Sequence, residues 1–194
     1  MYSYYLIYKP YGILSQFTPE GKKLGLSSFL NLPKDCYPVG RLDAESEGLL
    51  LITNDKAVNN RLLDPKEKHE RTYFVQVDGA ITDEAIAKLR KGVQIKVDGK
   101  PYETLPAKVE KIEEPVLPPR NPPVRFRLSV PTSWIKLVLI EGKNRQVRHM
   151  TAAVGFPTLR LVRAQIGKFD IGQMLPGDLV QVERGELMKK LGLK

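Results

Sequence analysis

The sequence predicts an α+β protein built on a large, mainly antiparallel sheet flanked by helices. Two observations predict it. Short apolar runs with strand-like alternation recur along the chain and are mostly separated by turn residues. A few stretches of helical period are interspersed among them. Strands linked mainly by hairpins favour an antiparallel sheet over a parallel one with a helix in every crossover.

The expected elements follow in chain order. Strands are expected at residues 4–8, 49–53, 72–77, 93–97, 107–112, 124–130, 135–140, 159–162, 165–168 and 179–182. Helices are expected at residues 26–30, 56–63, 83–91, 144–154 and 185–194. Thr82 is a suitable N-cap for the helix at 83–91, and Gly92 and Gly155 are suitable stops. Residues 175–178, Leu-Pro-Gly-Asp, predict a turn.

Length and composition indicate an ordinary globular protein. The chain has 194 residues, of which 42% are hydrophobic and 27% charged, so we expect one domain or two closely packed halves. A single cysteine, Cys36, excludes an internal disulfide and a multi-cysteine zinc site. The start shows no signal peptide, and no apolar run approaches the roughly 20 residues that span a bilayer. We therefore expect a soluble, cytoplasmic protein with no membrane partner.

Positive charge is concentrated in one part of the chain. Residues 115–168 contain ten Lys or Arg and one acid, Glu141, which gives +9, whereas the other 140 residues carry 21 charges of each sign. Six of the 15 prolines lie between residues 115 and 131, and residues 120–125 should be stiff, extended and exposed. A basic region on a neutral body favours a polyanionic partner such as nucleic acid. The alternative is a basic face that serves solubility.

Residues 40–48 form the first candidate site. Gly40 and Gly48 bracket a loop, directly before the strand at 49–53, that holds three carboxylates. Loops presented by a rigid sheet commonly carry reactive groups, and a carboxylate here can act as a nucleophile or a base. Spacing alone does not choose between Asp43, Glu45 and Glu47, and an exposed acidic turn is the alternative.

Residues 141–150 form the second candidate site, and Tyr73 is the third. Lys143, Arg145 and Arg148 cluster at the expected start of the helix at 144–154, where the helix dipole adds positive potential. They can bind phosphate, pair with a buried carboxylate, or form a basic helix surface. Tyr73 lies on a strand and can stack on a nucleobase, or it can be structural.

Four motifs resemble, in order, those of the RsuA-like family of pseudouridine synthases. Gly40-Arg-Leu-Asp43 with Ser46-Glu-Gly-Leu-Leu50 is similar to the family's signature loop, and residues 6–12 resemble its first motif. Tyr73 stands where the family has its active-site tyrosine. Residues 141–148 resemble the basic motif and residues 155–163 the C-terminal motif. The matches extend from about residue 4 to residue 182.

Further residues resemble the RluE-type branch of this family, which acts on large-subunit ribosomal RNA. These are residues 16–18, 119–124 and 131–134. Many relatives carry an N-terminal S4 RNA-binding domain, but here the catalytic motifs begin at once. We therefore expect a single catalytic domain at residues 1–194 with the pseudouridine synthase-like fold and an active-site cleft across the sheet. Two residues depart from the pattern: Lys143 stands where relatives have arginine, and His149 where a second arginine is common.

The resemblance implies the isomerisation of a specific uridine in 23S ribosomal RNA, free or in a large-subunit precursor, without a cofactor or metal. It assigns the catalytic carboxylate to Asp43, with Tyr73 packed against the target base. A carboxylate in a dry pocket needs a nearby cation, for which Lys143 is the first choice and Arg145 the second. Leu161 or Ile166 would wall the pocket, and Arg41 would fill the gap left in the RNA. The remaining expected RNA contacts are Arg120, Arg125, Arg145, Arg148 and Arg163.

Two alternative functions remain open from the sequence. One is a non-catalytic protein that binds ribosomal RNA or assists ribosome assembly, which fits the charge distribution equally well. The other is a glycoside hydrolase that pairs Asp43 with Glu45 or Glu47, which leaves the basic region without a purpose. A monomer is the default expectation.

Overall fold

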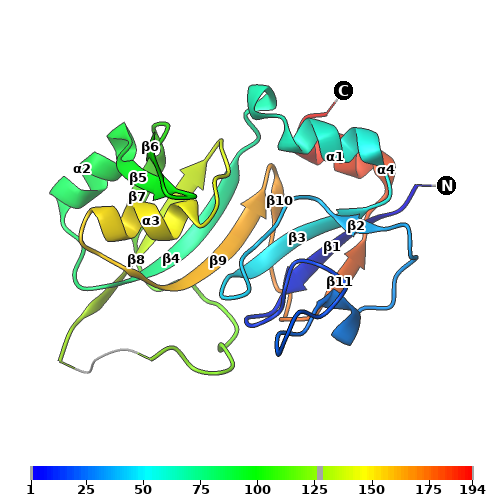
Figure 1. Ribbon diagram of the computed structural model, residues 1–194, viewed down its shortest axis with the longest axis horizontal. Helices are drawn as coiled ribbons and strands as arrows, with labels where there is room; N and C mark the ends of the chain where they lie inside the picture. Colours follow the sequence, from blue (N-terminus) through cyan, green and yellow to red (C-terminus); the bar gives the residue numbers. More distant parts are fainter. Residues whose placement is uncertain (1, 126–128, 194) are drawn as a thin grey trace. The chain divides into compact units, whose positions relative to one another are not determined.

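Two units make up the part of the chain that the computed structural model describes, residues 2–125 and 129–193 (Figure 1). Unit 1 contains the chain up to His69 and again from Arg163 onward, and unit 2 contains residues 70–162. The chain passes from unit 2 back into unit 1 within strand β9 (Thr158–Ile166).

The strands of unit 1 lie in the order β11-β1-β3-β9. β1 (Tyr4–Lys9) pairs antiparallel with β3 (Glu47–Thr53) and, on its other side, with β11 (Leu179–Gln181). The register places Ile7 opposite both Leu50 and Leu179. Since β11 has only three residues and all are exposed, one edge of this part of the sheet is short.

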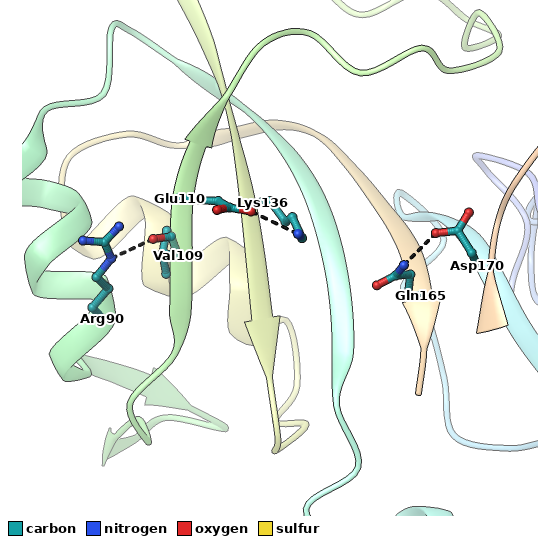
Figure 2. A network of polar contacts seen from close by, with 6 residues as sticks. All are labelled: Arg90, Val109, Glu110, Lys136, Gln165 and Asp170. Atoms are coloured by element: carbon teal, nitrogen blue, oxygen red, sulfur yellow. Dashed lines mark hydrogen bonds and ion pairs between the residues drawn. The ribbon is translucent and has the colours of Figure 1, made fainter. Parts of the chain in front are cut away.

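Two short strands extend the sheet of unit 1. β2 (Tyr37–Pro38) pairs with the end of β3, and β10 (Phe169–Asp170) forms a hairpin with the end of β9. The Gln165 amide donates a hydrogen bond to the Asp170 carboxylate across this hairpin, as Figure 2 shows.

β3 is the centre of the core of unit 1. All seven of its residues are buried, which explains why the run Leu-Leu-Leu-Ile is apolar on both faces rather than alternating. The side chains of one buried cluster come from β1, β3 and the segment between β1 and β2: Ile7, Leu26, Leu30, Cys36, Leu50 and Ile52. This rigid strand begins immediately after the loop that carries Asp43.

The helices of unit 1 begin and end where local chemistry predicts. α1 (Lys56–Leu63) is capped by Asp55, whose carboxylate accepts hydrogen bonds from two backbone N–H groups of the first turn. α4 (Arg184–Leu191) ends at Gly192 in the left-handed conformation. Two single turns of 3₁₀ helix, η1 (Leu26–Ser28) and η2 (Pro65–Glu67), complete the unit.

The strands of unit 2 lie in the order β9-β4-β8-β7. β4 (Arg71–Asp78) pairs antiparallel with β8 (Thr132–Leu139) over eight residues, and β8 pairs antiparallel with β7 (Lys108–Ile112). An exposed ion pair of 3.0 Å between Lys136 and Glu110 links β8 to β7 (Figure 2). Such exposed pairs contribute little stability, so the paired strands and the buried side chains hold this unit.

Two helices and a hairpin complete unit 2. α2 (Asp83–Lys91) is capped by Thr82 and fixed to β7 by Arg90, whose Nε donates to the Val109 carbonyl over 2.7 Å (Figure 2). α3 (Gln146–Ala153) follows β8. β5 (Gln94–Val97) and β6 (Lys100–Glu103) form a separate two-stranded hairpin that packs against α3.

Most expected elements are present, and the differences have physical reasons. One strand, β9, replaces the two expected at 159–162 and 165–168, because Arg163 and Ala164 are buried within it. The helix expected at 144–154 begins at Gln146, since Arg145 has a left-handed backbone conformation. Of the strand expected at 124–130, residues 126–128 lie outside the described residues, and the other four are not in a strand.

The short strands β2, β6 and β10 are additions that the sequence did not indicate. No helix in the described part of the chain has the length and apolarity needed to cross a membrane.

Candidate active site

The Asp43 loop of unit 1 connects β2 to β3. It begins with Gly40 at φ +69° and ends with Gly48 at φ +105°, both in the left-handed region that favours glycine. A Cβ at Gly48 would lie 2.7 Å from the backbone nitrogen of Arg163, so only glycine lets β9 come this close. Within this loop Arg41 is exposed, Leu42 is buried and Asp43 is half-buried.

Hydrogen bonds fix the backbone on both sides of Asp43. The Ser15 hydroxyl donates to the Leu42 carbonyl over 2.7 Å and accepts from the Leu42 N–H over 2.9 Å. The Gly12 N–H donates to the Ala44 carbonyl over 2.7 Å. The Asp43 carbonyl itself accepts from the Ser46 N–H over 3.0 Å, which closes a turn. The backbone position of Asp43 is therefore fixed by hydrogen bonds of the residues on either side of it.

A group of buried charges lies beneath this loop. Lys9, Glu47 and Arg163 are 0%, 1% and 4% exposed. The Lys9 ammonium donates to the backbone carbonyls of Pro10, Ile13 and Ala44 over 2.9, 2.7 and 3.4 Å, and the Arg163 Nε donates to the Leu49 carbonyl over 2.7 Å. Burial of charge is tolerated only with such partners.

The Lys9 ammonium and the Asp43 carboxylate are close enough to interact. Burial is the main cause that lowers the pKa of Lys9, to about 7, and the positive charge of Arg163 lowers it as well. The negative charges of Glu47 and Asp43 raise it in part. Unit 1 therefore contains a buried lysine whose charge interacts with that of Asp43, and Lys9 was not among the expected site residues. The signal available in the sequence was the position of Lys9, directly after the apolar run of residues 4–8.

The basic turn of unit 2, residues 141–146, is built on a buried glutamate. Glu141 accepts hydrogen bonds from the Gln146 amide over 2.6 Å, from the Leu105 N–H over 2.9 Å and from the Tyr102 hydroxyl. Gln146 in turn accepts from the Lys143 N–H over 2.9 Å. The exposed Lys143 ammonium lies 4.8 Å from the centroid of the Tyr102 ring, a cation–π contact.

Arg145 stands at the N-terminal end of α3. It is exposed and has φ +51°, a left-handed conformation that costs a non-glycine residue about 1–2 kcal/mol. Arg148, one turn further on, is half-buried. Positive side chains at a helix N-terminus, where N–H groups are unpaired within the helix, create a favourable place for an anion.

The other predicted site residues of unit 2 differ in exposure. Tyr73 is buried on β4, opposite Leu137 of β8, and Leu161 is buried on β9. Arg125 is exposed. Arg120 folds back on its own loop, with Nε and Nη2 donating to the carbonyls of Pro122 and Pro123 over 2.8 Å each. These two hydrogen bonds of the Arg120 guanidinium thus stabilise the conformation of the proline-rich segment.

The predicted residues belong to different units. Arg41, Asp43, Arg163 and Ile166 lie in unit 1, and the others lie in unit 2. The contact expected between Asp43 and Lys143 stays a prediction. Ile166 is buried opposite Phe169. Arg163 was expected to bind RNA, but its guanidinium is buried against β3, which fits a supporting role inside unit 1 better than a surface phosphate contact.

No group of three histidine, cysteine or carboxylate side chains suited to a metal ion occurs among residues 2–125 and 129–193.

Comparison with known proteins gives a consistent result. The family model for RNA pseudouridylate synthase matches residues 3–153. A protein of Vibrio parahaemolyticus named ribosomal large subunit pseudouridine synthase E is 50% identical over 175 residues, which cover 90% of this chain and 71% of that protein. A protein of the same name from Xanthomonas axonopodis is 50% identical over 88% of this chain and 89% of its own length.

More distant relatives agree. Ribosomal large subunit pseudouridine synthase B of Bacillus subtilis is 33% identical over 96% of this chain and 70% of its own length. A crystal structure of a pseudouridylate synthase matches the fold with a TM-score of 0.79 at 24% identity, covering 98% of this chain and 74% of that one. The α+β fold class and the resemblance to RsuA-like enzymes of the RluE type are confirmed. The chain belongs to the family of RNA pseudouridylate synthases, isomerases that convert uridine in RNA to pseudouridine.

Proposed function

We propose that this enzyme isomerises one specific uridine of 23S ribosomal RNA and that Asp43 is its catalytic carboxylate. The observation that carries the choice of RNA is the 50% identity, over nine-tenths of the chain, to relatives named for the large ribosomal subunit. The basic region at residues 115–168 supports a polyanionic substrate, because phosphate contacts supply much of the affinity for RNA.

The reaction needs no external reactant. The N-glycosidic bond of uridine breaks, and the same base rejoins the same ribose through carbon, so atoms and electrons balance within the nucleotide. A carboxylate serves such chemistry by attacking a carbon or by stabilising a developing positive charge on the sugar. For Asp43, attack on the ribose, attack on the base and removal of a sugar proton are three forms of the same proposal.

Asp43 is suited to this work because the backbone on both sides of it is held in place. Its loop is hydrogen-bonded at Leu42 and Ala44, Asp43 is half-buried, and its charge interacts with that of Lys9. A nearby cation stabilises a carboxylate in a dry pocket. We propose Lys143 as the cation that completes this environment, with Arg145 as the second choice.

The target base must leave the RNA stack to reach Asp43. Extruding a base costs a few kcal/mol, which contacts to the enzyme offset. We propose that Tyr73 packs against the extruded base, that Leu161 or Ile166 forms the opposite wall, and that the exposed Arg41 fills the gap in the RNA. Arg125, Arg145 and Arg148 would bind phosphates, with Arg120 shaping the proline-rich segment beside Arg125. We also propose that the enzyme acts in the cytoplasm as a monomer.

The decisive experiment measures tritium release from 23S ribosomal RNA that contains 5-tritiated uridine. The wild-type enzyme should release tritium, because forming the new carbon–carbon bond displaces hydrogen from C5 of uracil. Asp43→Asn should release none while binding the RNA with unchanged affinity, since the change removes one charge and keeps the size. An active Asp43→Asn enzyme would refute the assignment of the carboxylate.

The same experiment separates the proposal from a non-catalytic role in ribosome assembly. A protein that only binds RNA would release no tritium in its wild-type form. Mapping pseudouridines in ribosomal RNA from cells with and without the gene identifies the position: one pseudouridine in 23S RNA should disappear. If all 23S positions stay modified, the substrate lies elsewhere.

A further inference from the structure

The Ser15 side chain takes the place of a strand partner for the residue before Asp43. Its hydroxyl donates to the Leu42 carbonyl over 2.7 Å and accepts from the Leu42 N–H over 2.9 Å. Ser15 is 7% exposed and Leu42 6%, so water does not replace these bonds readily. The two residues are 27 positions apart, so this is a tertiary contact between the segment after β1 and the Asp43 loop.

Other bonds of the same segment hold the residue after Asp43. The Gly12 N–H and the Lys9 ammonium both donate to the Ala44 carbonyl, over 2.7 and 3.4 Å. Hydrogen bonds thus hold the backbone at Leu42 and at Ala44, and Asp43 lies between these two residues. Once these are fixed, the Cα–Cβ direction of Asp43 is fixed as well.

We infer that Ser15 is a positioning residue for Asp43: its hydroxyl bridge to Leu42 holds the carboxylate in its reactive position. The inference rests on the catalytic role proposed for Asp43. Of the two attachments, the Leu42 side is made entirely by a side chain, so it depends on the identity of residue 15. A serine hydroxyl can donate to a carbonyl and accept from an N–H with the same oxygen atom.

The bridge matters for rate because catalysis requires accurate placement of the reacting group. A displacement of about 1 Å can lower a rate by about 100-fold even when the substrate still binds. Without the Ser15 hydroxyl, the N–H and carbonyl of Leu42 lose their shared partner and the loop must move to find others. RNA contacts made by other residues are unaffected by such a movement.

A matched control exists at the other end of β3. The Thr53 hydroxyl donates to the Ser3 carbonyl over 2.7 Å and accepts from the Asp55 N–H over 3.0 Å, and Thr53 is 0% exposed. The Thr53 hydroxyl, like that of Ser15, both donates and accepts a hydrogen bond within unit 1. Thr53 is at the far end of β3, roughly 20 Å from the Asp43 loop at ~3.3 Å per residue. Thr53→Val and Ser15→Ala each remove a bridging hydroxyl with little change of shape.

The experiment compares single-turnover tritium release from 23S RNA containing 5-tritiated uridine, together with RNA affinity and melting temperature. Ser15→Ala should lower the rate constant at saturating enzyme by about 10- to 100-fold, with unchanged Kd for the RNA. Ser15→Thr, which keeps the hydroxyl, should recover most of the rate. Thr53→Val should lose a similar amount of thermal stability and keep the wild-type rate constant when assayed below its melting temperature.

The outcomes distinguish this inference from the proposed function. A wild-type rate for Ser15→Ala, or an equal loss of rate for Thr53→Val, overturns the positioning role, while an inactive Asp43→Asn leaves the catalytic assignment standing. An active Asp43→Asn removes the catalytic assignment whatever Ser15 does. Should Ser15→Ala not fold, Ser15→Cys fills the same space with a weak hydrogen-bonding group, and the same loss of rate at unchanged Kd is required of it.

Discussion

The buried Lys9 ammonium makes the stability of this enzyme depend on pH. Burial lowers the pKa of Lys9 from 10.5 to about 7, against the attraction of Glu47 and Asp43. In the unfolded chain the side chain is solvated and its pKa returns to 10.5. Between these values the unfolded state binds a proton that the folded state has lost. The contribution of Lys9 to the free energy of unfolding therefore rises with pH from about 7 upward.

The size of the effect follows from the shift. One pKa unit corresponds to about 1.4 kcal/mol, and the folded state is about half protonated at pH 7, so this group adds about 2 kcal/mol between pH 7 and pH 9. Lys9→Met keeps the length of the side chain but does not titrate, so it removes this gain. It also leaves the carbonyls of Pro10, Ile13 and Ala44 without their donor, at a cost of about 1–3 kcal/mol.

Urea unfolding followed by circular dichroism at pH 7, 8 and 9 measures both effects. The control is Lys108→Met, because Lys108 is 74% exposed and pairs with Glu70 in an exposed ion pair. That variant should follow the wild-type pH dependence. If Lys9→Met gains as much stability between pH 7 and pH 9 as the wild type, Lys9 does not titrate there in the folded protein, and the reasoning from its burial is wrong.

Three further changes test other parts of the structure. Gly48→Ala should lower the free energy of unfolding by about 3 kcal/mol or more, because at φ +105° the new Cβ would lie 2.7 Å from the backbone nitrogen of Arg163. Its control is Gly99→Ala, at φ +80° with no atom within 4 Å, which should lower the free energy of unfolding by only about 1–2 kcal/mol in the same urea experiment. Arg145→Gly should raise the melting temperature, since it relieves the left-handed strain at φ +51°, yet weaken RNA binding and reduce the salt slope of log Kd by about 1; equal affinity would place the RNA away from α3. Arg125→Ala should reduce that slope by about 1 with an unchanged melting temperature, and an unchanged slope would show that this exposed guanidinium contacts no phosphate.

Elements with strong local signals could be predicted from the sequence. α1 and α2 have the expected boundaries because Asp55 and Thr82 supply N-caps that depend only on neighbouring residues. β9 was expected as two strands, at 159–162 and 165–168. Arg163, which lies between them, is buried with its Nε bonded to the Leu49 carbonyl 114 residues earlier in the chain, and no local pattern reveals such a partner.

The candidate site shows the same limit of local patterns. The Asp43 loop, Tyr73 and the basic turn stand out in the sequence because their motifs are short and contiguous, and their roles stay predictions. Lys9 and Ser15 were not assigned a function, because what they do depends on Ala44 and Leu42, 35 and 27 residues away. Glu141 begins the basic motif but was given no role of its own, although it accepts three hydrogen bonds that shape the turn beside Lys143.

These contacts give a physical meaning to the motif around Asp43. Gly48 allows the backbone of β9 to approach the loop closely. Glu47 is buried, as are Lys9 and Arg163, so its carboxylate is not accessible to RNA from the surface. Asp43 is half-buried, and the backbone on both sides of it is hydrogen-bonded. Spacing alone could not choose among the three carboxylates, whereas burial excludes Glu47 and the pinned backbone on both sides favours Asp43 over the exposed Glu45.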